Sequence, residues 1–411
     1  MQMSFDELLE IKTRLLINGV NAQINVPGTW KERTEHLYQH DSGEVPVFSY
    51  PQEIVLSPEA GVGQKTVVNV RYRRASPWKL IDRGGQPTLT GPSIGEIPVA
   101  LAPRPNFYSR KLGTGVVVSQ VVQMLGLDAL GVIPNNYCAY FAERDECRFC
   151  EIEPSYREVG SYPSMRKSVD VISEGLRAAL ADDDAKHLVI TAGNLKKNDR
   201  TATVYGDILG RVGFDSSRPV YRFGSLMAPE SHERMEYMHR QGLDGVAYNL
   251  EFFREDQFTK LAPGKAKYGR KRLMEALEYA RDTFGNGHVY TNLVYGVQSW
   301  EHSGKPIDFG KENAICLDAV EALLDAGILP LFTIYHTTGK NSMGRISIDE
   351  AAAIDFHREY GRLVAASGLV PSNRTGVLFN VSTISNHVYN DAFAAAFAAS
   401  EQSGRSGPQS G

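Results

Sequence analysis

The sequence predicts an α/β protein, built as a complete or partial TIM-type (βα) barrel with an N-terminal β-rich extension. Two observations favour this fold class. From about residue 127 onward, short apolar runs alternate with long amphipathic patterns, as expected for repeated βα units. The apolar runs show no polar face, which is typical of parallel strands covered by helices. Six or seven such units fit a barrel better than a short open sheet.

The N-terminal extension, residues 1–126, has a different pattern. Residues 4–18 place their aliphatic side chains on one stripe and predict an amphipathic helix. The runs 46–57 and 65–74 are short, alternating or β-branched, and bounded by Pro and Gly, so we expect irregular β structure there. The run 116–126 fits either a helix or a strand.

The barrel is assigned to residues 127–398, and the Ser-, Gly- and Gln-rich tail, 399–411, is expected to be disordered. The expected strands share an apolar centre: 130–137, 187–193, 219–225, 245–251, 288–296, 328–335 and 376–381. The helical patterns between them are longer and include 167–182, 269–284, 311–327 and 347–367.

The composition excludes several classes of function. The chain has 44 Lys and Arg against 48 Asp and Glu, a net charge of −4, and a pI near 6.2. This balance argues against a protein that mainly coats nucleic acid or an anionic membrane. No run reaches the roughly 18 apolar residues of a membrane span, and the N-terminus lacks the basic-then-apolar order of a signal peptide. We therefore expect a cytoplasmic protein that binds neither nucleic acid nor membrane.

Three of the four cysteines, Cys138, Cys147 and Cys150, form a C-x8-C-x2-C cluster, whereas Cys316 stands alone on an apolar helix stripe and is expected in the core. So few cysteines do not make a disulfide framework, and clustered thiols in a reducing compartment more often hold a metal or do redox chemistry. The cluster follows the first expected barrel strand. Because barrel active sites are built from loops at the carboxyl ends of strands, this loop is the best candidate for a functional site.

Two kinds of metal site remain open at this point. Three thiolates can hold three irons of a [4Fe–4S] cluster and leave the fourth iron open to a ligand. A tetrahedral zinc site would need a fourth ligand, and residues 130–160 contain no His or further Cys. That ligand would have to come from a distant segment, so a zinc-binding βα-barrel enzyme stays as the alternative. An iron–sulfur protein that only passes electrons is a third possibility.

The cysteine cluster resembles that of the radical S-adenosylmethionine (radical SAM) superfamily. The family's usual motif is C-x3-C-x2-C with an aromatic residue just before the last cysteine, and Phe149 matches that aromatic. The first gap is eight residues here instead of three, a departure that some members share. The resemblance covers about residues 130–345, and the region after the fourth strand is similar to biotin-synthase-like members.

The resemblance also implies SAM-binding positions. After the second strand, where the family has a Gly-rich turn that receives the SAM amino group, this chain has Gly193 and Asn194. Glu251 ends the fourth strand, and Arg272 lies at the start of the helix after a Pro-Gly segment, where its planar fork would suit the SAM carboxylate. Gly296 ends the fifth strand, whose backbone borders adenine in the family; the Glu that often follows is absent.

Tyr335 and His336 follow the sixth strand and are the candidate catalytic residues. A strand-end His is a credible substrate ligand or acid–base group because it can titrate near neutral pH. The alternative is a structural His that only makes hydrogen bonds. The side chains that we expect at the barrel rim are polar or aromatic and suit a compact polar substrate: Tyr221, Arg222, Tyr248, Asn292, Tyr295, Tyr335 and His336.

The resemblance implies two cofactors, a [4Fe–4S] cluster held by Cys138, Cys147 and Cys150 and SAM, together with a flavodoxin- or ferredoxin-like electron donor. The reduced cluster would cleave SAM to a 5′-deoxyadenosyl radical, which abstracts hydrogen from a small polar substrate and leads to rearrangement, cyclisation or bond cleavage. With only Cys316 left over, a second cluster for sulfur donation is not expected. A radical SAM enzyme that modifies a peptide is an alternative, because the N-terminal extension is unassigned.

Overall fold

The computed structural model describes residues 3–24, 53–56, 66–92, 94–159, 165–337 and 339–369. The strand expected at 376–381 and the tail 399–411 lie outside these ranges, as does most of the run 46–57.

The described residues form two sheets, and the larger one has seven strands in the order β13-β12-β11-β10-β9-β8-β7. The strands are β7 (Val122–Leu125), β8 (Ala129–Val132), β9 (His187–Thr191), β10 (Tyr221–Leu226), β11 (Gly245–Tyr248), β12 (Val289–Tyr295) and β13 (Leu329–Ile334). All neighbours from β8 to β13 run parallel. Within the described ranges, β7 and β13 are the two edges and the sheet forms an open barrel, so the prediction of an α/β fold with a partial TIM-type barrel is confirmed.

The sheet begins before the expected domain boundary at residue 127. β7 pairs antiparallel with β8, with Leu125 opposite Ala129, so this strand belongs to the larger sheet and not to the N-terminal extension. The ambiguous run 116–126 resolves into a 3-10 turn at Val118–Gln120 followed by β7.

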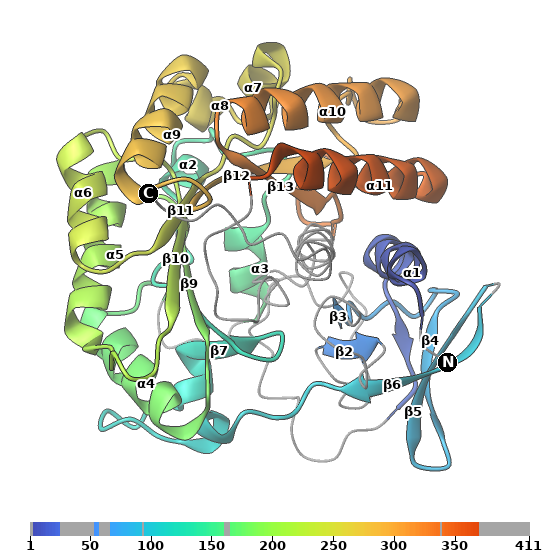
Figure 1. The fold of residues 1–411 in the computed structure, drawn as a ribbon, viewed down its shortest axis with the longest axis horizontal. Coiled ribbons are helices and arrows are strands. Elements are labelled where there is room, and N and C mark those ends of the chain that lie inside the picture. The colour runs from blue at the N-terminus through green and yellow to red at the C-terminus, as the bar shows by residue number, and fades with distance from the viewer. Residues whose placement is uncertain are drawn as a thin grey trace.

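Helices cover the outer face of the larger sheet (Figure 1). The long ones are α4 (Val169–Asp182), α5 (Asn198–Val212), α6 (His232–Arg240), α9 (Arg270–Phe284), α10 (Phe309–Asp325) and α11 (Glu350–Ser367). The side chains of Ser168, Asp308 and Asp349 accept backbone N–H groups at the starts of α4, α10 and α11, which satisfies donors that a helix start leaves unpaired. Shorter helices lie in the connections after β8 and β11: α2 (Ala139–Ala142), α3 (Ile152–Val159), α7 (Glu255–Leu261) and α8 (Pro263–Ala266).

The N-terminal extension contains a helix and the smaller sheet. That sheet has the order β1-β4-β5-β6-β2-β3 and consists of β1 (Asn21–Ala22), β2 (Glu53–Leu56), β3 (Thr66–Asn69), β4 (Lys79–Arg83), β5 (Gln86–Gly91) and β6 (Gly95–Leu101). A second 3-10 turn, Asn106–Ser109, leads toward the barrel. Helix α1 (Phe5–Asn18) begins with a capping box between Ser4 and Glu7. Its Arg14 lies 2.7 Å from Glu350 of α11, so the extension is tied to the barrel.

No helix in the described ranges combines the length and the apolar composition that crossing a bilayer requires.

Candidate active site at the carboxyl edge of the barrel

The three clustered cysteines lie in the connection that follows β8. Cys138 immediately precedes α2, while Cys147 and Cys150 lie in the turn before α3. The backbone N–H of Cys150 donates to the carbonyl of Cys147 at 3.0 Å, which closes this turn. The connection therefore stands at the carboxyl end of a parallel strand, the edge of the sheet where such folds build active sites.

One side of the cysteine loop is fixed by the segment that carries α7 and α8. The Arg148 N–H donates to the Leu261 carbonyl at 2.8 Å, and the Gly264 N–H donates to the Asp145 carbonyl at 2.9 Å. Residue 264 has to be glycine in this arrangement, because a Cβ there would lie 2.4 Å from the Tyr140 ring.

The other side is fixed by the loop after β13. The buried carboxylate of Glu151 accepts the backbone N–H groups of Lys340 at 3.0 Å and Asn341 at 3.2 Å, together with the Thr337 hydroxyl. The Asn341 side chain donates in turn to the Phe149 carbonyl at 3.1 Å. Because hydrogen bonds hold the loop on both sides, the thiols occupy defined positions.

The three thiols lie close enough to act on one another electrostatically. Burial is the main cause that raises the pKa of each, to about 12 for Cys150, and the charges of the neighbouring cysteines raise the pKa of Cys147 and Cys150 further. The positive charge of Lys265 acts in the opposite direction on all three. For Cys138, the backbone N–H groups of Tyr140 and Asn194 also favour the thiolate. A bound cation would be needed to release all three protons at neutral pH.

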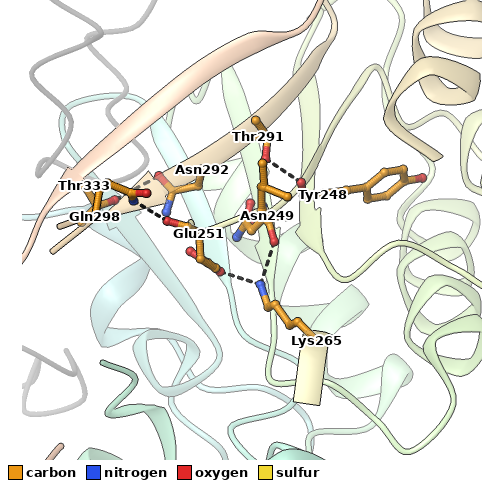
Figure 2. A network of polar contacts seen from close by, with 10 residues as sticks. Tyr248, Asn249, Glu251, Lys265, Thr291, Asn292, Gln298 and Thr333 are labelled. Carbon is orange, nitrogen blue, oxygen red and sulfur yellow. Dashed lines mark hydrogen bonds and ion pairs between the residues drawn. The ribbon is translucent and has the colours of Figure 1, made fainter. Parts of the chain in front are cut away.

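A buried ion pair accompanies the thiols. Lys265 of α8 lies 2.5 Å from the carboxylate of Glu251, and its ammonium also donates to the Asn249 carbonyl at 2.9 Å (Figure 2). Lys265 is 9% exposed and Glu251 6%. The sequence reasoning placed Glu251 at this edge but passed over Lys265, although its position directly after the Pro-Gly pair of the family segment was a usable signal.

The backbone of Glu251 is left-handed, with φ of +63°. A side chain other than glycine rarely adopts this conformation, and doing so costs on the order of 1 kcal/mol or more. Ladder hydrogen bonds to β12 hold the residue in place: its N–H donates to the Asn292 carbonyl at 2.7 Å, and its carbonyl accepts from Val294 at 3.0 Å. Strain of this kind collects at functional sites.

Gly193 and Asn194 follow β9 and contact the cysteine loop. The Ala139 N–H donates to the Asn194 carbonyl at 2.8 Å, and the Gly193 N–H donates to Asn135 at 2.8 Å. The side-chain amide of Asn194 donates to Asn198, but its oxygen is buried without a hydrogen-bond partner among the described residues. This oxygen is free to accept a hydrogen bond from a ligand.

The remaining predicted cofactor residues are spread more widely. The Phe149 ring packs edge to face on Phe252, with centroids 5.6 Å apart. Gly296 has φ of +93° and donates its N–H to Glu312 at 2.7 Å. Arg272 is exposed on α9, where its guanidinium lies over the Tyr268 ring and donates to the Glu230 carbonyl at 3.0 Å. Among the described residues, these contacts do not join Arg272 to the cysteine loop, so its role toward SAM stays a prediction.

The two candidate catalytic residues lie after β13. The Tyr335 hydroxyl donates hydrogen bonds to the Asn341 side chain at 3.1 Å and to the Gly344 carbonyl at 2.5 Å, so both of its partners lie in the loop after β13. Burial is the main cause that lowers the pKa of His336 to about 4, and the positive charge of Arg71 acts in the same direction. His336 is therefore neutral at pH 7 and suits a hydrogen-bonding role better than proton transfer.

Four of the side chains expected at the rim lie elsewhere. Tyr221 and Arg222 are at the amino end of β10, where they contact His288 at 3.1 Å and Asp244 at 2.7 Å. Tyr295 points outward to α10 and donates to Asn313 at 2.8 Å. The Tyr248 ring is fully buried and points away from the Glu251–Lys265 pair (Figure 2).

The inner face of the sheet carries a set of uncharged polar side chains, here called the polar belt. Its members share incomplete burial and lie on β9, β10, β12 and β13 or directly after β11: Thr191, Ser225, Asn249, Asn292 and Thr333. Asn249 donates to Ser225 at 3.2 Å, and Thr333 donates to Asn292 at 3.1 Å. The outward-facing neighbours are at most 4% exposed: Ile190, Leu226, Tyr248, Leu293 and Phe332. Water therefore reaches the inner face but not the outer one.

In the described ranges, no three His, Cys, Asp or Glu side chains surround a single point as ligands of one metal ion would.

No protein-family model and no curated protein sequence matches this chain. Solved structures with some likeness include the hydrogenase maturase HydG from Carboxydothermus hydrogenoformans, at 13% identity and a TM-score of 0.40, covering 62% of this chain and 59% of that one. Methylornithine synthase (PylB) matches at 11% identity and a TM-score of 0.39, and the match covers 62% of this chain and 74% of that one. The Escherichia coli coproporphyrinogen III oxidase HemN, a radical SAM enzyme, matches at 11% identity and a TM-score of 0.39, and the match covers 67% of this chain and 63% of that one.

The chain spans about half the length of a further HydG structure, 49% of it. Identities and TM-scores of this size place no activity on the chain, so the functional inference rests on the residues of the site.

Proposed function

We propose that this chain is a radical SAM enzyme that acts on a small polar substrate. The observation behind the proposal is the grouping of three thiols, Cys138, Cys147 and Cys150, with the buried cation of Lys265 at the carboxyl edge of a partial βα barrel. A structural zinc site almost always has four protein ligands around one ion. A [4Fe–4S] cluster takes each thiolate on a different iron, so its ligands need not meet at one point.

The donor set fits such a cluster. Three sulfur ligands would leave one iron without a protein ligand, and SAM would occupy that position. A bound, reduced cluster would supply the single electron with which the C5′–S bond of SAM breaks to give methionine and a 5′-deoxyadenosyl radical. The chain's own contribution is to hold the three thiols in place and to keep water away from Cys147, which is 8% exposed and is packed among apolar side chains.

Two groups beside the thiols suit the methionyl end of SAM. The unpartnered Asn194 oxygen can accept a hydrogen bond from the SAM ammonium group. Lys265 and Glu251 present a cation and an anion close to each other, which matches the paired charges of an amino acid head group. Gly193 contributes by letting the backbone of the second strand approach the cysteine loop.

The polar belt supports a small polar substrate. Its side chains carry hydroxyl and amide groups. The side-chain oxygen of Asn249 is buried without a hydrogen-bond partner among the described residues, so it can accept a hydrogen bond from a ligand. Hydroxyl and amide groups would orient a compact molecule with its own hydroxyl or amino groups. The only cysteine beyond the cluster, Cys316, is fully buried on α10, so we propose rearrangement, cyclisation or bond cleavage without sulfur donation. A flavodoxin- or ferredoxin-like protein would supply the electron.

Anaerobic reconstitution with iron and sulfide tests the cofactor assignment. We expect a brown protein with about four irons per chain that forms 5′-deoxyadenosine from SAM and dithionite. A colourless protein that binds one zinc tightly would instead support a zinc enzyme. An iron-loaded protein that never cleaves SAM would point to an electron carrier.

Deuterium transfer tests the substrate assignment. The loaded enzyme is incubated with deuterated small metabolites or deuterated peptides, and 5′-deoxyadenosine is examined for deuterium. Transfer from a small molecule is expected to fall in Thr333→Val, which loses a belt hydroxyl, and to persist in Thr203→Val, the same change on the outer helix α5. Transfer from peptides alone would overturn the substrate proposal.

A further inference from the structure

Gln298 lies in the connection after β12, where it is 1% exposed and uses its whole amide group. The side-chain nitrogen donates to the carbonyl of Glu251 at 2.8 Å and to that of Val294 at 2.9 Å. The side-chain oxygen accepts the N–H of Phe253 at 3.0 Å. One buried side chain thus joins the connection after β12 to the connection after β11.

The backbone of Gln298 is anchored from a different element. Glu312 of α10 is fully buried, and its carboxylate accepts the N–H groups of Gly296 at 2.7 Å, Gln298 at 2.9 Å and Ser299 at 2.7 Å. The Ser299 hydroxyl donates to the same carboxylate at 2.8 Å. Charge-assisted bonds of this kind are the strong ones, so the position of Gln298 is set by α10.

The bonds of Gln298 hold the backbone directly after the strained Cα of the site. They reach the carbonyl of Glu251 and the N–H of Phe253, two residues later, and so they fix the exit of the chain from the left-handed residue. A left-handed Glu is unfavourable on its own and persists only where its surroundings fix it. Figure 2 shows the amide of Gln298 on the backbone of Glu251, whose carboxylate reaches Lys265.

We infer that Gln298 is a positioning residue: it holds the Glu251 backbone in its left-handed turn and thereby sets the Glu251–Lys265 ion pair beside the three thiols. Glu312 provides its anchor on α10. The inference rests on the proposed function for its consequence, which is that Gln298 controls SAM affinity without touching SAM or the cluster.

A double-mutant cycle on the anaerobically reconstituted protein tests this role. Gln298→Met keeps the length of the side chain and removes all three hydrogen bonds. We expect iron content near that of the wild type, and SAM affinity, measured by equilibrium dialysis, weakened about ten- to hundredfold, as for loss of one charged contact. Glu251→Gln should lower the affinity for SAM to a similar extent. Because Gln298 acts through Glu251, the double variant should bind SAM no more weakly than the single variant with the lower affinity.

Gln86→Met is the matched control, since Gln86 also donates to two backbone carbonyls, those of Pro87 at 2.9 Å and Val99 at 3.0 Å, but in β5 of the smaller sheet. It should leave SAM affinity unchanged. Multiplicative losses in the double variant, or unchanged SAM affinity in Gln298→Met, would overturn the inference.

A second variant covers poor folding. Gln298→Glu keeps an oxygen for the Phe253 N–H and loses both donated bonds, so it replaces Gln298→Met in the cycle if that protein does not fold. If neither folds while Gln86→Met does, Gln298 serves fold stability and the inference fails. If the wild type retains no iron and binds no SAM, the proposed function fails instead, and the two failures are thereby distinguished.

Discussion

Gly193 and Tyr137 approach so closely that a Cβ atom on residue 193 would lie 2.2 Å from the Tyr137 carbonyl oxygen and 3.1 Å from the Cβ of Cys138. The turn after β9 therefore sets where the cysteine loop begins. Only glycine leaves room for this contact.

Gly193→Ala should displace the start of the cysteine loop. Overpacking against backbone costs about 1–3 kcal/mol, and the displacement should reduce the iron retained after reconstitution. Urea unfolding and iron analysis measure both effects. Gly113→Ala is the control, since a Cβ there meets nothing closer than 3.5 Å. Full iron retention with unchanged stability in Gly193→Ala would contradict the packing argument.

Each clustered cysteine should be required for the metal site. Replacing Cys138, Cys147 or Cys150 with Ala is expected to abolish iron retention and SAM cleavage, because three protein ligands leave no spare anchor. Cys316→Ala should preserve both, since its thiol lies 3.9 Å from Glu312 within α10. A Cys147→Ala protein with a normal absorption spectrum and activity would remove Cys147 from the ligand set.

Lys265 should matter more for SAM binding than Arg272. Lys265→Met removes the buried cation beside the thiols and leaves Glu251 uncompensated, so we expect SAM affinity to fall by roughly one to two decades. Arg272→Ala removes an exposed cation and should cost less. Equilibrium dialysis of both reconstituted variants shows which one loses more SAM affinity. A greater loss of SAM affinity in Arg272→Ala would support Arg272 as the ligand of the SAM carboxylate.

Acid sensitivity should be traceable to His357. Burial lowers its pKa to about 4, against about 6.5 in an unfolded chain. The unfolded state therefore binds the proton first as pH falls. The contribution of His357 to the free energy of unfolding is fully present above about pH 6.5 and declines by up to about 3 kcal/mol towards pH 4.

His357→Phe should reduce the slope of unfolding free energy against pH between about pH 4 and 6.5, because the aromatic ring remains among Tyr295, Phe356 and Tyr360 but no longer takes up a proton. Urea titrations at several pH values measure this slope. His302→Phe, at an exposed position, is the control. Identical slopes for His357→Phe and the wild type would contradict the assignment.

The sequence predicted the barrel and the place of the thiol site because both follow from local patterns. Apolar runs and amphipathic helices alternate with fixed periods, and the loop after a parallel strand always lies at the carboxyl edge. The faces of the strands were harder to predict. Tyr248 and Asn249 are adjacent and point to opposite sides, and a strand that is apolar throughout does not reveal which side is the inner one.

The features of the site that the sequence does not show arise from tertiary packing. Burial, together with the charge of Arg71 from the N-terminal extension, lowers the pKa of His336 to about 4, and no local sequence pattern joins those two segments. The role of Lys265 depends on a four-residue helix, α8, which brings its ammonium to the Asn249 carbonyl directly after β11. The left-handed backbone of Glu251 has no sequence signal, since glycine is the residue expected there.

The order of strands has a consequence for synthesis on the ribosome. Every strand of the larger sheet pairs with the one made just before it, so the sheet can grow in step with translation and close each loop over a short span. Helix α1 is in a different position. Its Arg14 meets Glu350 across a sequence separation of 336 residues, so α1 cannot dock on α11 until nearly the whole barrel has left the exit tunnel.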